Sequence, residues 1–583
     1  MRLRALLLAA AIALPAAPAL AESAAAARAA VPAQLTADQR TAYREIFAAI
    51  RAEDWAGAAA KLDALAEGPL HAAARAELYL AKNSPKVELQ PLLALLEKAP
   101  ELPGAEQLSR LATTRGATAL PVLPQAQPLI WQGGQPRRAR AQSGSKNDPL
   151  AAELDQLVQP LIVADRPAEA EALLREREVM LAPQARTEFL QRIGWAHYLI
   201  GNSADARRLS DEARQGSGEF VLHAAWTSGL AAWRMKDCKA AAEAFATVGG
   251  RATDVELAAA GHYWASRADM ICGRPERVQS QLRSAARLKE TFYGMLAATA
   301  LGIRTPNYVG LHDYRDAEWR GIATKPNVRT AIALAEIGET NLADSFIRHQ
   351  ARIGGPSDHH ALLHLAADLN LASTQFWLAH NAPRGTSVNL GARYPRPDWS
   401  PTRGWRVDQA LVFGHALQES NFRTQVVSPA GAQGLLQVRP GTAGDIARSR
   451  GQAFSRDELG QPGPNLEYGQ SYIEFLRDRA ETGGLLPKVI AAYNAGPKPI
   501  GEWNFRATDQ SDPLLYIESI PYWETRGYVP IVLRNYWVYD QANGKSSPSR
   551  HALAQGLWPK FPGMAGAAGV RLQGNRELAS GAD

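Results

Sequence analysis

The chain has 583 residues, a formal net charge of +6, 46% hydrophobic residues and 21% charged residues. This length exceeds what one hydrophobic core usually organises, so we expect several domains. The hydrophobic content excludes a mainly disordered chain, and the modest charge, without a large basic block, argues against nucleic-acid binding.

The chain begins with a predicted secretory signal peptide, residues 1–21. Arg2 and Arg4 form a basic start, residues 6–14 are an apolar run too short to span a bilayer, and small residues precede a cut before Glu22. No later apolar run reaches the roughly 18 residues that a membrane helix needs. We therefore expect an exported, periplasmic protein without a membrane span.

Residues 22–385 are predicted to form an α-superhelix of stacked helix hairpins. Ala, Leu, Arg and Glu, which favour helices, dominate this region. Turn signals begin at positions 165, 202, 237 and 272, so they lie 37, 35 and 35 residues apart. Each precedes an Ala-rich stretch, a spacing similar to that of tetratricopeptide repeats. Further turns are predicted at 54–58 and 339–343, and tryptophans before the later turns are expected to pack inside the stack: Trp195, Trp233 and Trp264.

Residues 125–148 interrupt this helical pattern. Their Pro, Gly, Ser and Arg content predicts an exposed, mobile loop. Its arginines, Arg137, Arg138 and Arg140, either contact an anionic polymer or are merely solvated.

The two cysteines, Cys238 and Cys272, lie in adjacent predicted hairpins. An exported protein can keep a disulfide, but the geometry that decides the pairing is not visible in the sequence.

A stretch rich in Gly, Pro and Arg, residues 386–404, is predicted to link the superhelix to a C-terminal domain, residues 405–550. The remaining residues, 551–583, are rich in Gly and Ala and are expected to form a flexible tail.

The C-terminal domain opens with an apolar helix that is expected to end near Glu419. The apolar residues of one helical face precede it: Ala410, Leu411, Phe413 and Leu417. A carboxyl at that position is partly desolvated and lies at the negative end of the helix dipole, and both effects raise its pKa. The pattern therefore suggests a general acid, although a solvated glutamate at a frayed helix end would fit the same local sequence.

Small and turn-forming residues follow, from Ser428 to Gly434, and the sequence then becomes apolar again. This is either an ordinary hairpin or the floor of a sugar-binding cleft, to which Ser428 and Gln437 supply hydrogen bonds. Further helices are predicted at 465–476 and 489–494. Tyr493, near the end of the second, points either into the cleft or to a backbone partner.

Five pieces of the C-terminal sequence share an order and spacing with one family. They resemble the soluble lytic transglycosylases of glycoside hydrolase family 23, from Asp408 to Tyr539. Arg439 departs from the family pattern, in which an apolar residue is common. The pieces are Gln418-Glu419-Ser420-x-Phe422, Ser428-x-Ala430-Gly431-Ala432-x-Gly434-Leu435-Leu436-Gln437, Pro440-x-Thr442-Ala443, Ala492-Tyr493-Asn494-Ala495-Gly496-Pro497 and Glu518-Ser519-Ile520-Pro521-x-x-Glu524-Thr525-Arg526-x-Tyr528-Val529.

The resemblance implies a lysozyme-like, mainly α-helical catalytic domain seated on a helical ring or arch. It also implies cleavage of the β-1,4 bond between N-acetylmuramic acid and N-acetylglucosamine in peptidoglycan. Glu419 would act first as acid and then as base, giving a 1,6-anhydro product without water. Ser428, Gln437, Tyr493 and Glu518 would bind substrate, although Glu518 would also fit a buried pair with Arg526.

Two other functions fit the same features. One is a peptidoglycan hydrolase like goose-type lysozyme, and the other is a non-catalytic wall-binding scaffold. We expect no metal or other cofactor, because His415 stands alone and no ligand cluster accompanies it. The expected partners are peptidoglycan strands, with cell-wall synthesis proteins as further candidates, and the sequence does not indicate the oligomeric state.

Overall fold

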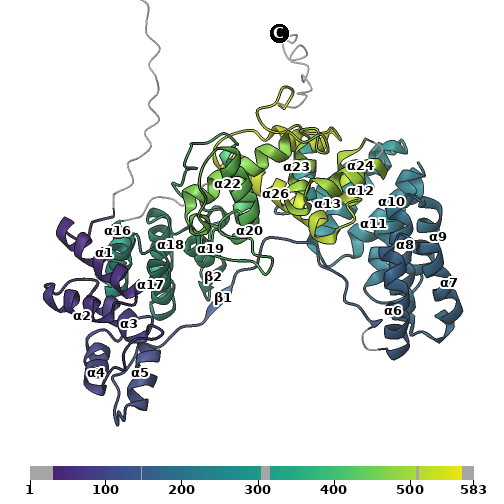
Figure 1. Ribbon diagram of the computed structural model, residues 1–583. Coiled ribbons are helices and arrows are strands. Elements are labelled where there is room, and N and C mark those ends of the chain that lie inside the picture. The colour runs from purple at the N-terminus through teal and green to yellow at the C-terminus, as the bar shows by residue number, and fades with distance from the viewer. Residues whose placement is uncertain (1–30, 146–147, 304–315, 507–510, 568–583) are drawn as a thin grey trace, which may run out of the picture.

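The described part of the molecule is built almost wholly from helices. The computed structural model describes residues 31–145, 148–303, 316–506 and 511–567. Over these ranges a C-terminal domain bridges two helical lobes, and the three parts together form an arch (Figure 1). The predicted all-α fold class is therefore confirmed.

The first lobe joins two stretches that are far apart in the sequence, and these enclose one hydrophobic core. Its helices are α1 Ala37–Arg51, α2 Trp55–Ala64, α3 His71–Leu80, α4 Leu89–Lys98, α5 Ala105–Thr114, α15 Asp316–Ile322, α16 Pro326–Glu336, α17 Thr340–Ile353, α18 His359–Asp368 and α19 Ala372–His380. At the predicted turn before α2, the Asp54 side chain accepts a hydrogen bond from Gly57 N–H and so caps the helix. An ion pair of 2.8 Å between Arg40 and Glu336 ties α1 to α16.

The second lobe is a stack of helix hairpins. Its helices are α6 Pro149–Val163, α7 Pro167–Arg177, α8 Pro183–Leu199, α9 Ser203–Ala213, α10 Phe220–Arg234, α11 Cys238–Arg251, α12 Val255–Ile271, α13 Pro275–Arg287 and α14 Phe292–Ala300. The second helix of each predicted hairpin begins just after its predicted turn, and Asn202 and Asp237 cap α9 and α11. Trp264 is fully buried, with its ring edge-on to Trp233, so the packing role predicted for it is confirmed.

A disulfide between Cys238 and Cys272 joins two adjacent hairpins of the second lobe. Cys238 is the first residue of α11 and Cys272 caps α12, and their Cα atoms lie 5.6 Å apart. Stacking of the helices brings the two residues together, which the sequence alone left open.

The stretch between α5 and α6 is a crossing segment, residues 115–145. Most of its residues from 125 onward are at least partly exposed, as predicted, but specific contacts with the rest of the protein hold it in place. It first adds a short strand to the first lobe, where β1 Leu129–Trp131 pairs antiparallel with β2 Asn381–Pro383. It then runs along the C-terminal domain to the second lobe (Figure 1). There Glu188 accepts hydrogen bonds from its last residues. The Gly, Pro and Arg content indicated a free loop. In the structure this composition belongs to an extended segment that runs from the first lobe, along the C-terminal domain, to the second lobe.

The C-terminal domain shares its hydrophobic core with the second lobe. Phe292 of α14 stacks on Trp537 of α26, with ring centroids 5.2 Å apart, and both rings are buried. The helices of the domain are α20 Gln409–Ser420, α21 Pro440–Ser449, α22 Pro462–Arg477, α23 Leu486–Ala495, α24 Pro497–Arg506, α25 Pro513–Glu518, α26 Trp523–Ala542 and α27 Pro548–Ala554. Single 3-10 turns lie in the described ranges at Glu178–Met180, Pro356–Asp358, Leu390–Arg393 and Arg456–Gly460.

The residues on either side of this domain are more ordered than the sequence suggested. In the predicted linker, residues 386–404, Tyr394 is buried edge-on to Tyr539. The predicted flexible tail, residues 551–583, is corrected over its described part. Residues up to 567 pack on the domain, where Phe561 is buried and its N–H donates to Gly484 O at 2.8 Å.

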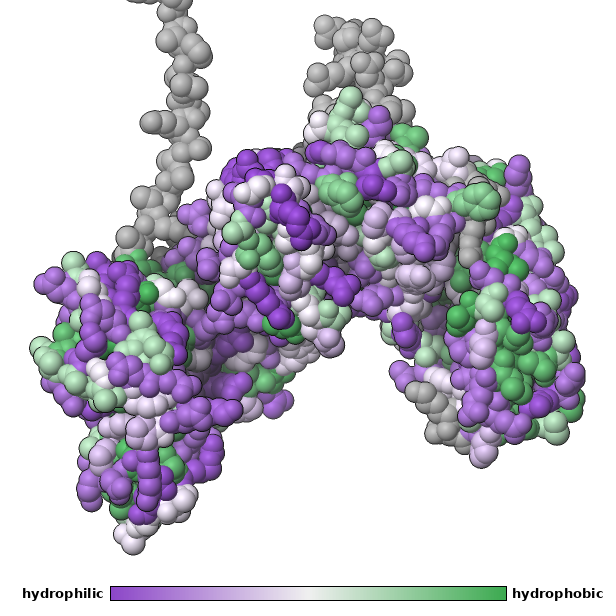
Figure 2. All heavy atoms as spheres, in the orientation of Figure 1, coloured by the Kyte–Doolittle hydropathy of each residue, from purple (hydrophilic) through white to green (hydrophobic). Residues whose placement is uncertain are grey.

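The surface of the arch is mainly hydrophilic on the face shown in Figure 2, with apolar patches over the second lobe. Among the helices that the structure describes, none is long and apolar enough to cross a membrane. The predicted signal peptide, residues 1–21, lies outside the described residues.

Candidate active site

Glu419 lies at the end of a buried helix, as the sequence predicted. Asp408 caps the start of α20, and the left-handed Asn421, with φ 51°, ends it two residues after Glu419. Gly414, in the middle of α20, lets the helix approach α26 closely. A Cβ there would lie 3.2 Å from the backbone N of Tyr536. This close packing fixes the end of α20 against α26.

The carboxyl of Glu419 is held and electrostatically perturbed by α26. The Tyr528 hydroxyl donates a hydrogen bond of 2.5 Å to its Oε1. Burial raises the pKa of Glu419 to about 7, the Tyr528 hydrogen bond opposes this rise, and the negative charge of Glu524 adds to it. A carboxyl with a pKa near neutrality can both give and retake a proton.

Two further rings surround this carboxyl. His415, one turn before Glu419, is buried, and burial lowers its pKa to about 4, so it is neutral at pH 7. The Tyr493 ring lies 4.8 Å from the His415 ring, and the Tyr493 hydroxyl donates to Leu436 O at 2.7 Å. The pKa of Tyr493 is raised well above its usual value by burial and by the charge of Glu419. The Tyr493 hydroxyl therefore takes the backbone-bonded placement, one of the two that the sequence left open, and the charge of Glu419 acts on it.

Hydrogen bonds within the loop between α20 and α21 hold its conformation. Ser428 Oγ accepts a hydrogen bond from Ala432 N–H at 3.0 Å, and the Gln437 side-chain amide donates to Gly434 O at 2.9 Å. Gly434 has φ 70°, and a Cβ there would lie 2.1 Å from Leu459 O, so only glycine fits. Ser428 and Gln437 thus shape the loop. Both remain partly exposed, as does Arg439 at the start of α21.

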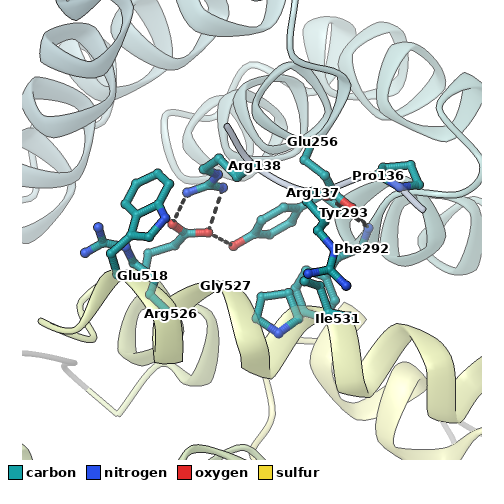
Figure 3. Close-up of a pocket in the computed structure, with 12 residues that line it drawn as sticks. Pro136, Arg137, Arg138, Glu256, Phe292, Tyr293, Glu518, Arg526, Gly527 and Ile531 are labelled. Carbon is teal, nitrogen blue, oxygen red and sulfur yellow. Dashed lines mark hydrogen bonds and ion pairs between the residues drawn. The ribbon is translucent and has the colours of Figure 1, made fainter. Parts of the chain in front are cut away.

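Glu518 is a buried, ion-paired carboxylate, which is one of its two predicted roles, but its partner is not the predicted one. It is 1% exposed, and it accepts two hydrogen bonds from Arg138 of the crossing segment, at 2.7 and 3.1 Å, and one from the Tyr293 hydroxyl at 2.7 Å (Figure 3). Arg526, its expected partner, donates instead to Ile520 O. Glu518 therefore joins the C-terminal domain to the second lobe, and we no longer propose it as a substrate-binding residue.

The structure assigns contacts to three residues that the sequence analysis did not connect with Glu419. Tyr528 and Glu524 were quoted only as parts of a motif, and nothing in the local sequence showed that Tyr528 bonds to Glu419 or that the charge of Glu524 acts on it. Arg137 donates to Gln418 Oε1 at 2.9 Å, so the crossing segment reaches the residue next to the acid. Its distance from Gln418 along the chain gave no signal for this contact.

The described residues contain no group of three or more His, Cys, Asp and Glu side chains arranged to hold a metal ion. The groups around Glu419 are hydroxyls, amides and carboxyls. Such a set suits proton transfer and carbohydrate binding.

Comparisons with known proteins agree with this arrangement. Residues 400–515 match the family model described as the transglycosylase SLT domain. The chain is 36% identical over 134 residues to the soluble lytic murein transglycosylases of Salmonella typhimurium and Escherichia coli, a match that covers 23% of this chain and 20% of each relative. A putative soluble lytic murein transglycosylase of Haemophilus influenzae is 25% identical over 298 residues, covering 49% of this chain and 47% of that protein.

Two solved structures share the fold over most of the chain. The 70 kDa soluble lytic transglycosylase Slt70 of E. coli superposes with a TM-score of 0.52 and 17% identity, over 90% of this chain and 99% of its own. An inactive mutant of the lytic transglycosylase Slt of Pseudomonas aeruginosa gives a TM-score of 0.53 and 18% identity, over 87% of each chain. The resemblance to soluble lytic transglycosylases predicted from the motifs is thereby confirmed.

Proposed function

We propose that this protein is an exported lytic transglycosylase that cleaves peptidoglycan strands between N-acetylmuramic acid and N-acetylglucosamine. The carrying observation is the carboxyl of Glu419, held by Tyr528 at the end of α20 with its pKa raised to about 7. The SLT-domain match over residues 400–515 supports the same reaction class.

In the proposed reaction Glu419 acts twice. As an acid it protonates the glycosidic oxygen, and the bond from that oxygen to C1 of the muramoyl residue breaks. As a carboxylate it then takes the proton from the muramoyl C6 hydroxyl, whose oxygen bonds to C1 and closes a 1,6-anhydro ring. Because the nucleophile belongs to the same sugar, it benefits from a high effective concentration. Glycosidases that use water normally employ two carboxyls, whereas in this proposal Glu419 performs both proton transfers.

The surrounding residues have supporting roles in this proposal. The Tyr528 and Tyr493 hydroxyls orient Glu419 and the reacting sugar, while Ser428 and Gln437 offer polar contacts from the loop. Residues 22–385 position glycan strands, residues 386–404 and 405–550 are the linker and the catalytic domain, and residues 1–21 direct export to the periplasm. No metal or cofactor is required.

The test is mass analysis of the muropeptides released from purified peptidoglycan. A lytic transglycosylase gives anhydro products that are one water lighter than hydrolysed ones. Products that carry the added water would instead identify a hydrolase like goose-type lysozyme, and the absence of any released product would favour a non-catalytic scaffold.

A further inference from the structure

A cavity of about 420 Å³ opens between the second lobe and the C-terminal domain, away from the contacts of Glu419. Its walls come from α8, α10, the crossing segment and the start of α26. We propose that this cavity, here called the arginine pocket, binds the carboxylates of an acidic peptide. Within the proposed function, that peptide is the stem carried by the glycan strand, and this last step rests on that function.

Aromatic rings and guanidinium groups alternate along the arginine pocket. The Arg526 guanidinium lies 4.4 Å from the ring centroid of Trp195 and 5.2 Å from that of Trp523. The Arg140 guanidinium lies 5.4 Å from the same Trp523 ring. Trp523 is therefore flanked by two cations, and Arg138 lies 4.9 Å from Trp226 at the back of the pocket.

Two of the four arginines that line the pocket are neutralised by carboxylates. Arg138 is paired with Glu518 at 2.7 Å. Arg192 contacts Asp155 at 2.5 Å and Glu188 at 3.3 Å. These two side chains therefore do not require a further anion.

The other two, Arg140 and Arg526, have no such partner. Within the described residues neither guanidinium has a carboxylate oxygen within 4.0 Å, and no Asp or Glu lines the pocket. Arg526 makes one protein hydrogen bond, to Ile520 O at 2.9 Å. Burial lowers the pKa of Arg526 to about 10, the negative charge of Glu518 opposes this change, and the positive charges of Arg138 and Arg140 add to it. A bound anion would offset the free-energy cost of burying the positive charge of Arg526.

Two further acids close to the pocket wall are engaged with the crossing segment. Asp254 accepts a hydrogen bond from Ala139 N–H, and Glu219 accepts one from Gln142 N–H at 2.8 Å, so both hold the crossing segment in place. They leave the two unpaired guanidinium groups facing the cavity.

The shape and position of the pocket favour a peptide carboxylate. A guanidinium fork matches a carboxylate in a bidentate geometry, and indole faces suit planar amide groups. Gln191 and Thr227 add polar groups to the wall. Trp523 directly precedes Glu524, whose charge reaches Glu419. The pocket therefore lies at the start of α26, the helix whose Tyr528 holds the acid.

The experiment measures binding to the full-length mature protein by calorimetry and tryptophan fluorescence. The probes are a synthetic stem tripeptide, L-Ala–γ-D-Glu–diaminopimelate, and the same tripeptide with every carboxylate amidated. We expect the acidic form to bind and the amidated form to bind at least about tenfold more weakly. Arg140→Ala, an exposed position, should weaken binding of the acidic form by about tenfold, and Arg140→Lys by less, because lysine keeps the charge but not the fork.

Arg283→Ala is the matched control, since Arg283 is an exposed arginine on α13 outside the pocket, and it should bind like the wild type. Equal binding of the two tripeptides, or unchanged binding by Arg140→Ala, would overturn the proposal. Release of anhydro products is measured in parallel. Turnover without tripeptide binding would reject the pocket alone, whereas tripeptide binding without turnover would reject the proposed reaction and leave the pocket standing.

Discussion

The Tyr528 hydroxyl donates a hydrogen bond of 2.5 Å to Oε1 of Glu419, across 109 residues of sequence. This contact joins the ends of two helices, α20 and α26, that otherwise pack through Gly414. It stabilises the carboxylate form of Glu419 against the burial that raises its pKa. Tyr528 therefore holds the acid in position and limits the rise in its pKa that burial causes.

Tyr528→Phe should raise the pKa of Glu419 further, because it removes the hydrogen bond that favours the ionised form. The alkaline limb of the pH–rate profile should move to higher pH, and kcat should fall by roughly tenfold through lost orientation of the carboxyl. The measurement is kcat/KM on peptidoglycan strands across pH. A profile that coincides with the wild type would remove Tyr528 from this role.

Glu524→Gln should act in the opposite direction. The Glu524 charge raises the pKa of Glu419, so its removal should lower that pKa and move the alkaline limb to lower pH. Glu502→Gln is a suitable control, because Glu502 lies on α24 and is not among the groups that perturb Glu419. A shift to higher pH would contradict the assigned electrostatics.

Glu419→Gln should abolish turnover, since glutamine is nearly isosteric but cannot donate and retake a proton. It should also stabilise the protein at higher pH. The folded-state pKa of about 7 lies above the ordinary 4.5, so the stability of the wild type is full below about pH 4.5 and is lost as pH rises towards 7.

The variant lacks this titration, so its free energy of unfolding should exceed that of the wild type by on the order of 2 kcal/mol above pH 7. Thermal unfolding at low and high pH checks this. Equal melting temperatures of the variant and the wild type at all pH values would mean that burial does not destabilise the ionised Glu419 carboxyl. Turnover by the variant at the wild-type rate would show that Glu419 is not the catalytic acid.

Arg138→Met should destabilise the protein by about 3 kcal/mol, because it leaves the buried Glu518 carboxylate without its ion pair. The double variant with Glu518→Gln should recover most of the loss. Arg448→Met is the control, since the Arg448–Asp445 pair is exposed and should contribute less than about 1 kcal/mol. Chemical unfolding measures all three. A double variant no more stable than Arg138→Met would show that the loss comes from packing rather than from charge.

Replacing both cysteines, Cys238→Ala with Cys272→Ala, should lower the free energy of unfolding of the second lobe by about 3 kcal/mol. The disulfide spans 34 residues, and its loss frees the unfolded chain. Turnover should persist at moderate temperature, because neither cysteine is among the described residues that interact with Glu419. Denaturant midpoints with and without the disulfide test this, and coincident midpoints would speak against a stabilising bridge.

Features that depend on neighbouring residues could be read from the sequence. The hairpin starts followed from turn signals and Ala-rich helices, and Asn202 and Asp237 cap helices where the pattern placed them. The position of Glu419 at the end of an apolar helix, and the direction of its pKa shift, also followed from local periodicity and burial. Hydrogen bonds within a helix link residues four apart, so such features are encoded over short stretches.

Features that depend on distant partners were decided only by the tertiary structure. Glu518 is paired with Arg138, 380 residues away, and no local pattern distinguishes that partner from the nearby Arg526. The crossing segment has the composition of a free loop, yet it packs between the domains, because composition reports backbone preference and not what covers it. The sequence by itself therefore determined the helices, the family resemblance and the candidate acid. The tertiary structure decided which charges meet, which cysteines bond and which groups surround Glu419, because long-range packing selects among partners that the local sequence leaves equivalent.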